Sequence, residues 1–311
     1  MTATTTYPVP EDARTTLGTP KPFVILAGTA HPRLAADIAT HVGTPLGACR
    51  VERFPDGEVA AEIQQSVRGH DVFIVQPMSP PVNDHLVELL VVVDACRRAD
   101  ADRITAIVPY FAYARADKRA GRRVPVTARA IADMMQSVGI DHVVTLDAHT
   151  PQIEGFFRIP IDNLSILPIM CSALESRLTD DTVIVSPDLG GVKRRMDGES
   201  VEVTQVIGDV RDRPCVIVDD MITTGGTIAE AARALRAHGA RDGLVVVASH
   251  GLLVSGASER LRGAGVSEVL VSDSIAGESD GALPVTRAGI ASLLADVVRR
   301  LMAAGSLRDL S

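Results

Sequence analysis

Two adjacent acids stand directly before a loop of threonine and glycine in the second half of this 311-residue chain. From Cys215 the sequence reads CVIVDDMITTGGT, so an apolar run ends in two carboxylates. The glycines let the backbone approach a phosphate closely, and the N–H and hydroxyl groups of the loop can donate hydrogen bonds to it. The carboxylates can accept hydrogen bonds from sugar hydroxyls. This pattern predicts a site for a phosphorylated sugar made of Asp219, Asp220, Thr223, Thr224, Gly225, Gly226 and Thr227.

A buried strand before this loop and a helix after it would hold the site in place. Cys215–Val218 is an apolar run typical of such a strand, and an apolar stripe at helical spacing follows Gly226. Ligands of open parallel sheets bind at the carboxyl ends of strands, where this loop lies. A turn with threonine as the helix cap would explain the same residues without a function. Two adjacent acids at the end of a buried strand favour the binding site.

Short runs rich in valine and isoleucine alternate with segments of helical period along the whole chain, which is typical of parallel α/β architecture. Four such runs lie in each half, so we expect two similar domains: 22–165 and 166–311, after a flexible tail over 1–21. The strand candidates are Phe23–Leu26, Val72–Val75, Thr105–Val108, Val143–Leu146, Thr182–Val185, Cys215–Val218, Leu244–Val247 and Glu268–Val271.

Composition restricts the class of protein. A net charge of −8 argues against a broad nucleic-acid-binding face, although five cations crowd the segment from Arg115 to Arg123. No apolar stretch is long enough to span a bilayer, and the polar N-terminus does not resemble a signal peptide. The four cysteines show no metal-binding spacing. We therefore expect a cytoplasmic protein with neither a membrane nor a nucleic-acid partner.

Eight further motifs, in one order along the chain, carry a resemblance to the ribose-phosphate pyrophosphokinases. The resemblance runs from about Val24 to the C-terminus, and the threonine-glycine loop is also similar to the phosphoribosyl-binding loop of type I phosphoribosyltransferases. It implies an α/β fold of two similar type I phosphoribosyltransferase-like domains, each a mostly parallel sheet flanked by helices. The motifs are RFPDGE at 53–58, SVRGHDVFIVQ at 66–76, NDHLVELLVVVDACRRA from Asn83, PYFAYARADKR at 109–119, VTLDAH at 144–149, QIEGFF at 152–157, VSPDLGG at 185–191 and GDV at 208–210.

The resemblance implies an enzyme that transfers pyrophosphate from Mg·ATP to the C1 hydroxyl of ribose 5-phosphate, giving phosphoribosyl pyrophosphate and AMP for nucleotide biosynthesis. It assigns the loop to ribose 5-phosphate, and Mg²⁺ to His149 and Asp188 at strand ends. A neighbouring subunit would supply part of the ATP site, so self-association as a dimer or hexamer is expected. The implied ATP-binding residues are Phe54, Asp56 and Glu58 of the neighbour, with Arg115 and Asp117.

The chain departs from the family pattern in several places. Ala116 stands where relatives usually have glutamine, Thr223 replaces an acid, and Arg158 stands where relatives commonly have aspartate. Between VSPDLGG and GDV the chain is shorter by about a helix and a strand. Counting back from Gly208 makes Lys193 and Arg195 the catalytic cations, whereas counting forward from Asp188 leaves no catalytic lysine. A solvated turn would explain the same basic run.

Two other functions remain open at this level. The shortened segment and Ala116 favour a non-catalytic partner that regulates an active synthetase, and the retained His149, Asp188, Asp219 and Asp220 oppose it. A phosphoribosyltransferase acting on a base is disfavoured by Thr223 and by the first-half motifs that serve ATP in the family.

Overall fold

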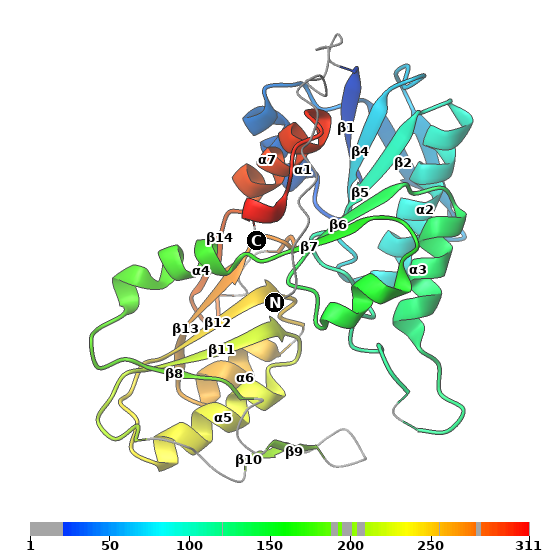
Figure 1. The fold of residues 1–311 in the computed structure, drawn as a ribbon. Helices are drawn as coiled ribbons and strands as arrows, with labels where there is room; N and C mark the ends of the chain where they lie inside the picture. The colour runs from blue at the N-terminus through cyan, green and yellow to red at the C-terminus, as the bar shows by residue number, and fades with distance from the viewer. Residues whose placement is uncertain are drawn as a thin grey trace, which may run out of the picture.

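Two five-stranded parallel sheets form the framework of the computed structural model (Figure 1). It describes residues 21–119, 121–187, 192–194, 201–203, 209–254, 256–277 and 281–310, with 192–194 and 201–203 described by their backbone alone. The first sheet has the order β1 (Phe23–Ala27), β4 (Asp71–Val75), β5 (Arg103–Ile107), β6 (His142–Leu146) and β7 (Ile161–Leu164). The second has the order β14 (Val285–Ala288), β13 (Val266–Ser272), β12 (Leu244–Gly251), β11 (Cys215–Ile222) and β8 (Val183–Val185).

Helices cover both faces of each sheet, which explains why the central strands are almost continuously apolar. Two antiparallel hairpins lie outside the sheets: β2 (Cys49–Arg53) with β3 (Val59–Ile63), and β9 (Val192–Arg194) with β10 (Val201–Val203). Short 3₁₀ turns occupy Pro151–Phe156, Glu175–Arg177 and Arg308–Leu310. The α-helices are α1 (Pro32–Val42), α2 (Val82–Arg98), α3 (Thr127–Ser137), α4 (Leu167–Leu174), α5 (Gly226–Ala237), α6 (Ala257–Gly263) and α7 (Ala291–Met302).

Among the described residues, two of the three hydrophobic cores contain side chains from both halves, because Ile275 of the second half belongs to the core of α2 and α3. Helices α2 and α3 pack on one face of the first sheet, and α5 and α6 pack on one face of the second. The remaining core joins Val144 and Leu146 of β6 to Val216 of β11 and Val247 of β12. Helix α7 belongs to this core and lies beside α1, so the end of the chain returns to the first half (Figure 1). The domain division at 165/166 stays a prediction.

The predicted fold class is confirmed, and each predicted strand falls on an observed one. The largest differences are in β11, which continues through Asp219 and Asp220 to Ile222 instead of ending at Val218, and in β12, which continues to Gly251 instead of Val247. The two strands are equally long because they pair with each other as far as Ile222 and Gly251. The sequence analysis missed the hairpin β2–β3 and the edge strands β7 and β14, whose apolar runs are short or interrupted by polar residues.

The apolar stripes predicted for two helices are confirmed. In α5 the side chains at 228, 231, 232 and 235 are all buried, and in α2 Leu86, Leu89 and Val93 are buried while Leu90 is half-buried. None of the helices in the described ranges is both long and apolar enough to cross a membrane.

Candidate functional site

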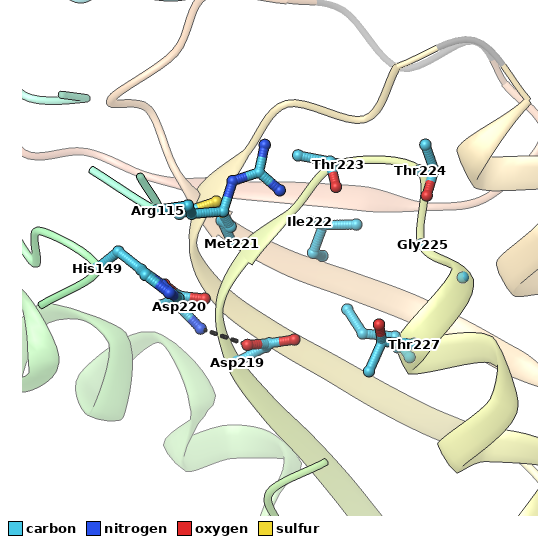
Figure 2. A pocket seen from close by; sticks show the side chains of 12 residues that line it. Arg115, His149, Asp219, Asp220, Met221, Ile222, Thr223, Thr224, Gly225 and Thr227 are labelled. Atoms are coloured by element: carbon cyan, nitrogen blue, oxygen red, sulfur yellow. Dashed lines mark hydrogen bonds and ion pairs between the residues drawn. The ribbon is translucent and has the colours of Figure 1, made fainter. Parts of the chain in front are cut away.

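A pocket at the carboxyl ends of β6 and β11 brings together residues from both halves of the chain (Figure 2). It encloses about 490 Å³, including space open to solvent. Arg115 and His149 enter from the first half, and the segment from Asp219 to Ile228 forms the rest of the wall. All seven residues of the predicted sugar-phosphate site line this pocket, together with Arg115 and His149. This is the edge of a parallel sheet at which ligands bind in α/β proteins.

The threonine-glycine loop turns sharply from β11 into α5. Gly225 has a φ of 71°, in the left-handed region that glycine adopts without strain, and it directly precedes the first turn of α5. In the described structure no side chain caps this helix, so N–H groups of its first turn remain for a ligand. Two hydrogen bonds hold the loop in place. The N–H of Val254 donates to the Thr223 carbonyl at 3.1 Å, and the side chain of Arg260 donates to the Thr224 carbonyl. The resulting N-terminus suits a phosphate group.

An ion pair between His149 and Asp220 joins the two halves in the pocket. Nδ1 of His149 donates to a carboxylate oxygen of Asp220, and the side chains are 32% and 30% exposed. This hydrogen bond raises the pKa of His149 above its ordinary value of 6.5. Burial alone would raise the pKa of Asp220, but the hydrogen bond and charge of His149 outweigh it, and the pKa is lowered. The side chain of Asp219 turns back to accept from the Asp220 N–H at 2.9 Å (Figure 2).

The stability of the protein is expected to depend on pH through this pair. Because the folded pKa of His149 is raised, the stabilisation is complete below the unfolded value near 6.5 and is lost as pH rises through the folded pKa. The free energy of unfolding of the parent should therefore fall, relative to that of His149→Gln, from about pH 6 to about pH 8. Urea unfolding of both proteins at the two pH values measures this. A constant difference would contradict the pairing.

The hairpin β2–β3 carries the predicted ATP-binding residues Phe54, Asp56 and Glu58 away from the pocket. All three are exposed, and Phe54 presents 54% of its surface. The turn is closed by hydrogen bonds between Phe54 and Glu58 and between Gly57 and Phe54, each of 2.8 Å. Within the described part of one chain these residues therefore do not join the pocket, as expected if they serve a neighbouring subunit.

The base of this hairpin is anchored to a buried carboxylate. Arg53 lies 3.6 Å from Glu88 and 3.5 Å from Asp84. The Glu88 side chain is fully buried and accepts from the backbone N–H and the hydroxyl of Thr29, both at 2.5 Å, and from the amide of Gln76 at 3.0 Å. A buried charge with this many donors is held in one position. This anchor holds the base of the hairpin in place, so the exposed tip starts from a fixed position.

Three of the predicted catalytic and metal-binding positions are not described at the level of side chains. Asp188 and Arg195 lie outside the described residues, and Lys193 is described only as a backbone position in β9. Asp117 does not line the pocket, yet its negative charge is close enough to raise the pKa of His149. The prediction for these four residues therefore rests on the sequence.

The side chains of the pocket fit Mg²⁺ in their chemistry. Mg²⁺ prefers carboxylate oxygen ligands, usually one or two from the protein, with phosphates and water completing its shell. The carboxylates of Asp219 and Asp220 surround His149, the one predicted Mg²⁺ ligand whose side chain is described, with negative charge that favours a cation. Among the residues that the structure describes, no group of three metal-binding side chains comes together. A site completed by substrate phosphates is consistent with that arrangement.

Sequence reasoning missed part of the pocket and its support. Met221, Ile222 and Ile228 line it, although nothing in their types points to ligand binding. It also missed the contact between Ser249 and Asp147, in which the serine hydroxyl donates to the carboxylate at 2.6 Å. These residues are 102 positions apart, so only the folded chain reveals the pair.

Comparisons with known proteins show which family the chain resembles. Residues 23–139 match the N-terminal domain of ribose phosphate pyrophosphokinase, and residues 193–311 match a phosphoribosyl synthetase-associated domain. The ribose-phosphate pyrophosphokinase of Vibrio parahaemolyticus is 44% identical over 299 residues, covering 89% of this chain and 95% of the relative. That of Helicobacter pylori is 40% identical over 308 residues, covering 93% and 96%. The crystal structure of phosphoribosylpyrophosphate synthetase from Mycobacterium smegmatis superimposes with a TM-score of 0.83 at 36% identity, covering 92% of this chain and all of that one.

Proposed function

The chain belongs to the ribose-phosphate pyrophosphokinase family, and from that membership we propose how its residues carry out the reaction. It is an enzyme that transfers pyrophosphate from ATP to the C1 hydroxyl of ribose 5-phosphate, releasing AMP. The observation that carries the site assignment is the pocket itself. It joins the loop of the second half to Arg115 and His149 of the first half.

The loop from Thr223 to Thr227 binds the 5-phosphate of the sugar. Its support is the uncapped start of α5, where N–H groups and the helix dipole both favour an anion. Asp219 and Asp220 line the same pocket and accept hydrogen bonds from the ribose hydroxyls. This arrangement fixes the sugar so that C1 faces His149 and Arg115, which is the positioning that in-line phosphoryl transfer requires.

The triphosphate lies on the side of the first half. Arg115 contacts it as a fixed positive charge. Asp117, whose negative charge raises the pKa of His149, belongs to the same ATP side of the site. His149 and Asp188 would hold Mg²⁺, and the ion would supply positive charge that neutralises the phosphates. Lys193 and Arg195 are the catalytic cations that stabilise the charge developing in the transition state.

One assay tests both the overall reaction and the role of Lys193. Purified protein is incubated with ATP, Mg²⁺ and ribose 5-phosphate, and the release of AMP is followed. We expect AMP only when the sugar phosphate is present, and a severe loss of turnover in Lys193→Ala. Folded protein that binds ribose 5-phosphate but releases no AMP would contradict an active enzyme and indicate a regulatory partner. Full activity of Lys193→Ala would contradict the assignment of that lysine.

The hairpin of one subunit completes the ATP site of another, and the protein is a homodimer or a hexamer. The support is the exposure of Phe54 at the tip of an anchored hairpin, away from the pocket of its own chain. An exposed aromatic face and two carboxylates suit an adenine base. The enzyme acts in the cytoplasm, and its two phosphoribosyltransferase-like domains meet near residue 165.

Mixing two inactive variants tests this sharing. Phe54→Ala removes the hairpin's aromatic face, and His149→Ala removes a pocket side chain. Co-assembled by joint refolding or co-expression, they are expected to recover about a quarter of the parental activity, since random pairing leaves that fraction of sites with both parts intact. Each variant mixed with itself serves as the control. No recovery in mixed assemblies would show that hairpin and pocket act within one chain.

A further inference from the structure

A buried histidine in the second half contacts β11, which carries Asp220, and the end of β6, which precedes His149. His250 lies in β12 with 2% of its surface exposed. In the sheet it pairs with Met221 of β11, the residue directly after Asp220. Its ring reaches the first half and hydrogen-bonds to the carbonyl of Leu146, the last residue of β6. His149 follows three positions later.

The contacts of His250 define which ring nitrogen carries the proton. The Leu146 carbonyl can only accept, so Nε2 donates to it at 3.0 Å. Nδ1 then accepts from the hydroxyl of Ser274 at 2.8 Å. Burial lowers the pKa of His250, which keeps this neutral form. The ring of Tyr110 packs edge-on against it, with centroids 5.2 Å apart. The imidazole is therefore held on three sides.

The preceding residue strengthens the same junction. The hydroxyl of Ser249 donates to Asp147 at 2.6 Å, so two successive residues of β12 hold two successive residues at the end of β6. Asp147 itself has a φ of 36°, an unusual conformation for a side chain other than glycine, where the chain turns toward His149. The backbone N–H groups of residues 147 and 148 donate to Leu164 and Asn163, each at 2.9 Å.

We propose that His250 is a positioning residue that sets the placement of His149 against Asp220 by fastening the end of β6 to the strand beside β11. The inference rests on the proposed function only in taking His149 and Asp220 as parts of the reacting site. Without the bond to Leu146, the described links of this turn to the second sheet are reduced to the Ser249–Asp147 bond and the His149–Asp220 pair itself. The sugar-phosphate loop keeps its own support from Val254 and Arg260.

Two substitutions distinguish the effect of losing the hydrogen bond to Leu146 from the effect of losing the imidazole ring. The amide nitrogen of glutamine in His250→Gln reaches where Nε2 stands and can still donate to Leu146. The shorter side chain in His250→Asn cannot. The matched control is His142→Gln, which alters a buried histidine at the opposite end of β6, bonded to Asp162 at 2.6 Å. Hydrogen exchange at the amides of 147 and 148, ribose 5-phosphate binding without metal, and kcat are measured for each.

For His250→Asn we expect about 10-fold faster exchange at these two amides and a kcat lower by about 10- to 100-fold. The dissociation constant of ribose 5-phosphate should stay within about twofold. His250→Gln should restore both exchange and kcat most of the way, and His142→Gln should lower the melting temperature without lowering kcat. Equal losses in His250→Gln and His250→Asn, or slow exchange in His250→Asn, would overturn the proposal. A parent protein that makes no AMP would instead refute the proposed function, and the exchange measurements would still test the junction.

Discussion

Replacing His149 by alanine is expected to lower kcat about 1,000-fold while the protein stays folded, because the site loses a proposed Mg²⁺ ligand beside the reacting phosphates. The side chain is 32% exposed and its one described hydrogen bond is to Asp220, so little of the core depends on it. Steady-state assays of AMP release together with circular dichroism measure both halves of the prediction. The control is His238→Ala, an exposed histidine at the end of α5.

A double variant of His149 and Asp220 tests whether the two side chains act together. If His149 and Asp220 act as a unit, His149→Ala combined with Asp220→Asn should be no slower than the slower single variant. Losses that multiply would show that the two side chains act independently. Retention of more than about a tenth of the parental kcat in His149→Ala would contradict its place in the reaction.

Substituting Gly225 by alanine should weaken ribose 5-phosphate binding about 100-fold or more and also destabilise the protein. A left-handed conformation costs a residue with a Cβ about 1–2 kcal/mol. The added atom would also lie 3.1 Å from Cγ of Leu261, which is closely packed behind the loop. The loop must shift to relieve this, and its N–H groups then no longer converge on the phosphate. Isothermal titration with ribose 5-phosphate and urea unfolding measure the two effects.

The adjacent glycine supplies the comparison. A Cβ at Gly226 would meet only the Thr224 hydroxyl, at 3.7 Å, and the residue lies in the first turn of α5. Gly226→Ala should therefore be as stable as the parent, whatever its affinity for the sugar phosphate. Equal stability of Gly225→Ala and the parent would show that the turn does not need the left-handed conformation.

Local pattern was sufficient for those parts of the site that are contiguous in the chain. The loop from Asp219 to Thr227 was predicted because strand, turn and helix succeed one another within about a dozen residues, and each has its own residue preferences. The helical stripe after Gly226 is a periodic signal of the same kind. The placement of the two acids inside β11 was not predicted, because the length of a strand depends on its neighbour, here β12.

The resemblance supplied what local pattern could not. It assigned His149 to Mg²⁺ and Arg115 to ATP, and the structure places both in the pocket with the loop. The contacts that fasten β6 to β12 were not predicted by either route. Ser249 and His250 lie beyond the predicted strand Leu244–Val247, and their partners lie more than a hundred positions away. Such contacts depend on how the sheets dock, which no periodicity encodes.

The packing of α7 against the first half makes the unfolding of the two halves cooperative. Because α7 lies beside α1 in a core that also holds Val216 and Val247, the face of each sheet in this core loses part of its cover once the other half has opened. Both halves should therefore melt in a single cooperative transition, with calorimetric and van't Hoff enthalpies that agree. A nascent chain released before Ala291 would lack α7 from the core that it shares with α1, so productive folding waits for α7 to emerge.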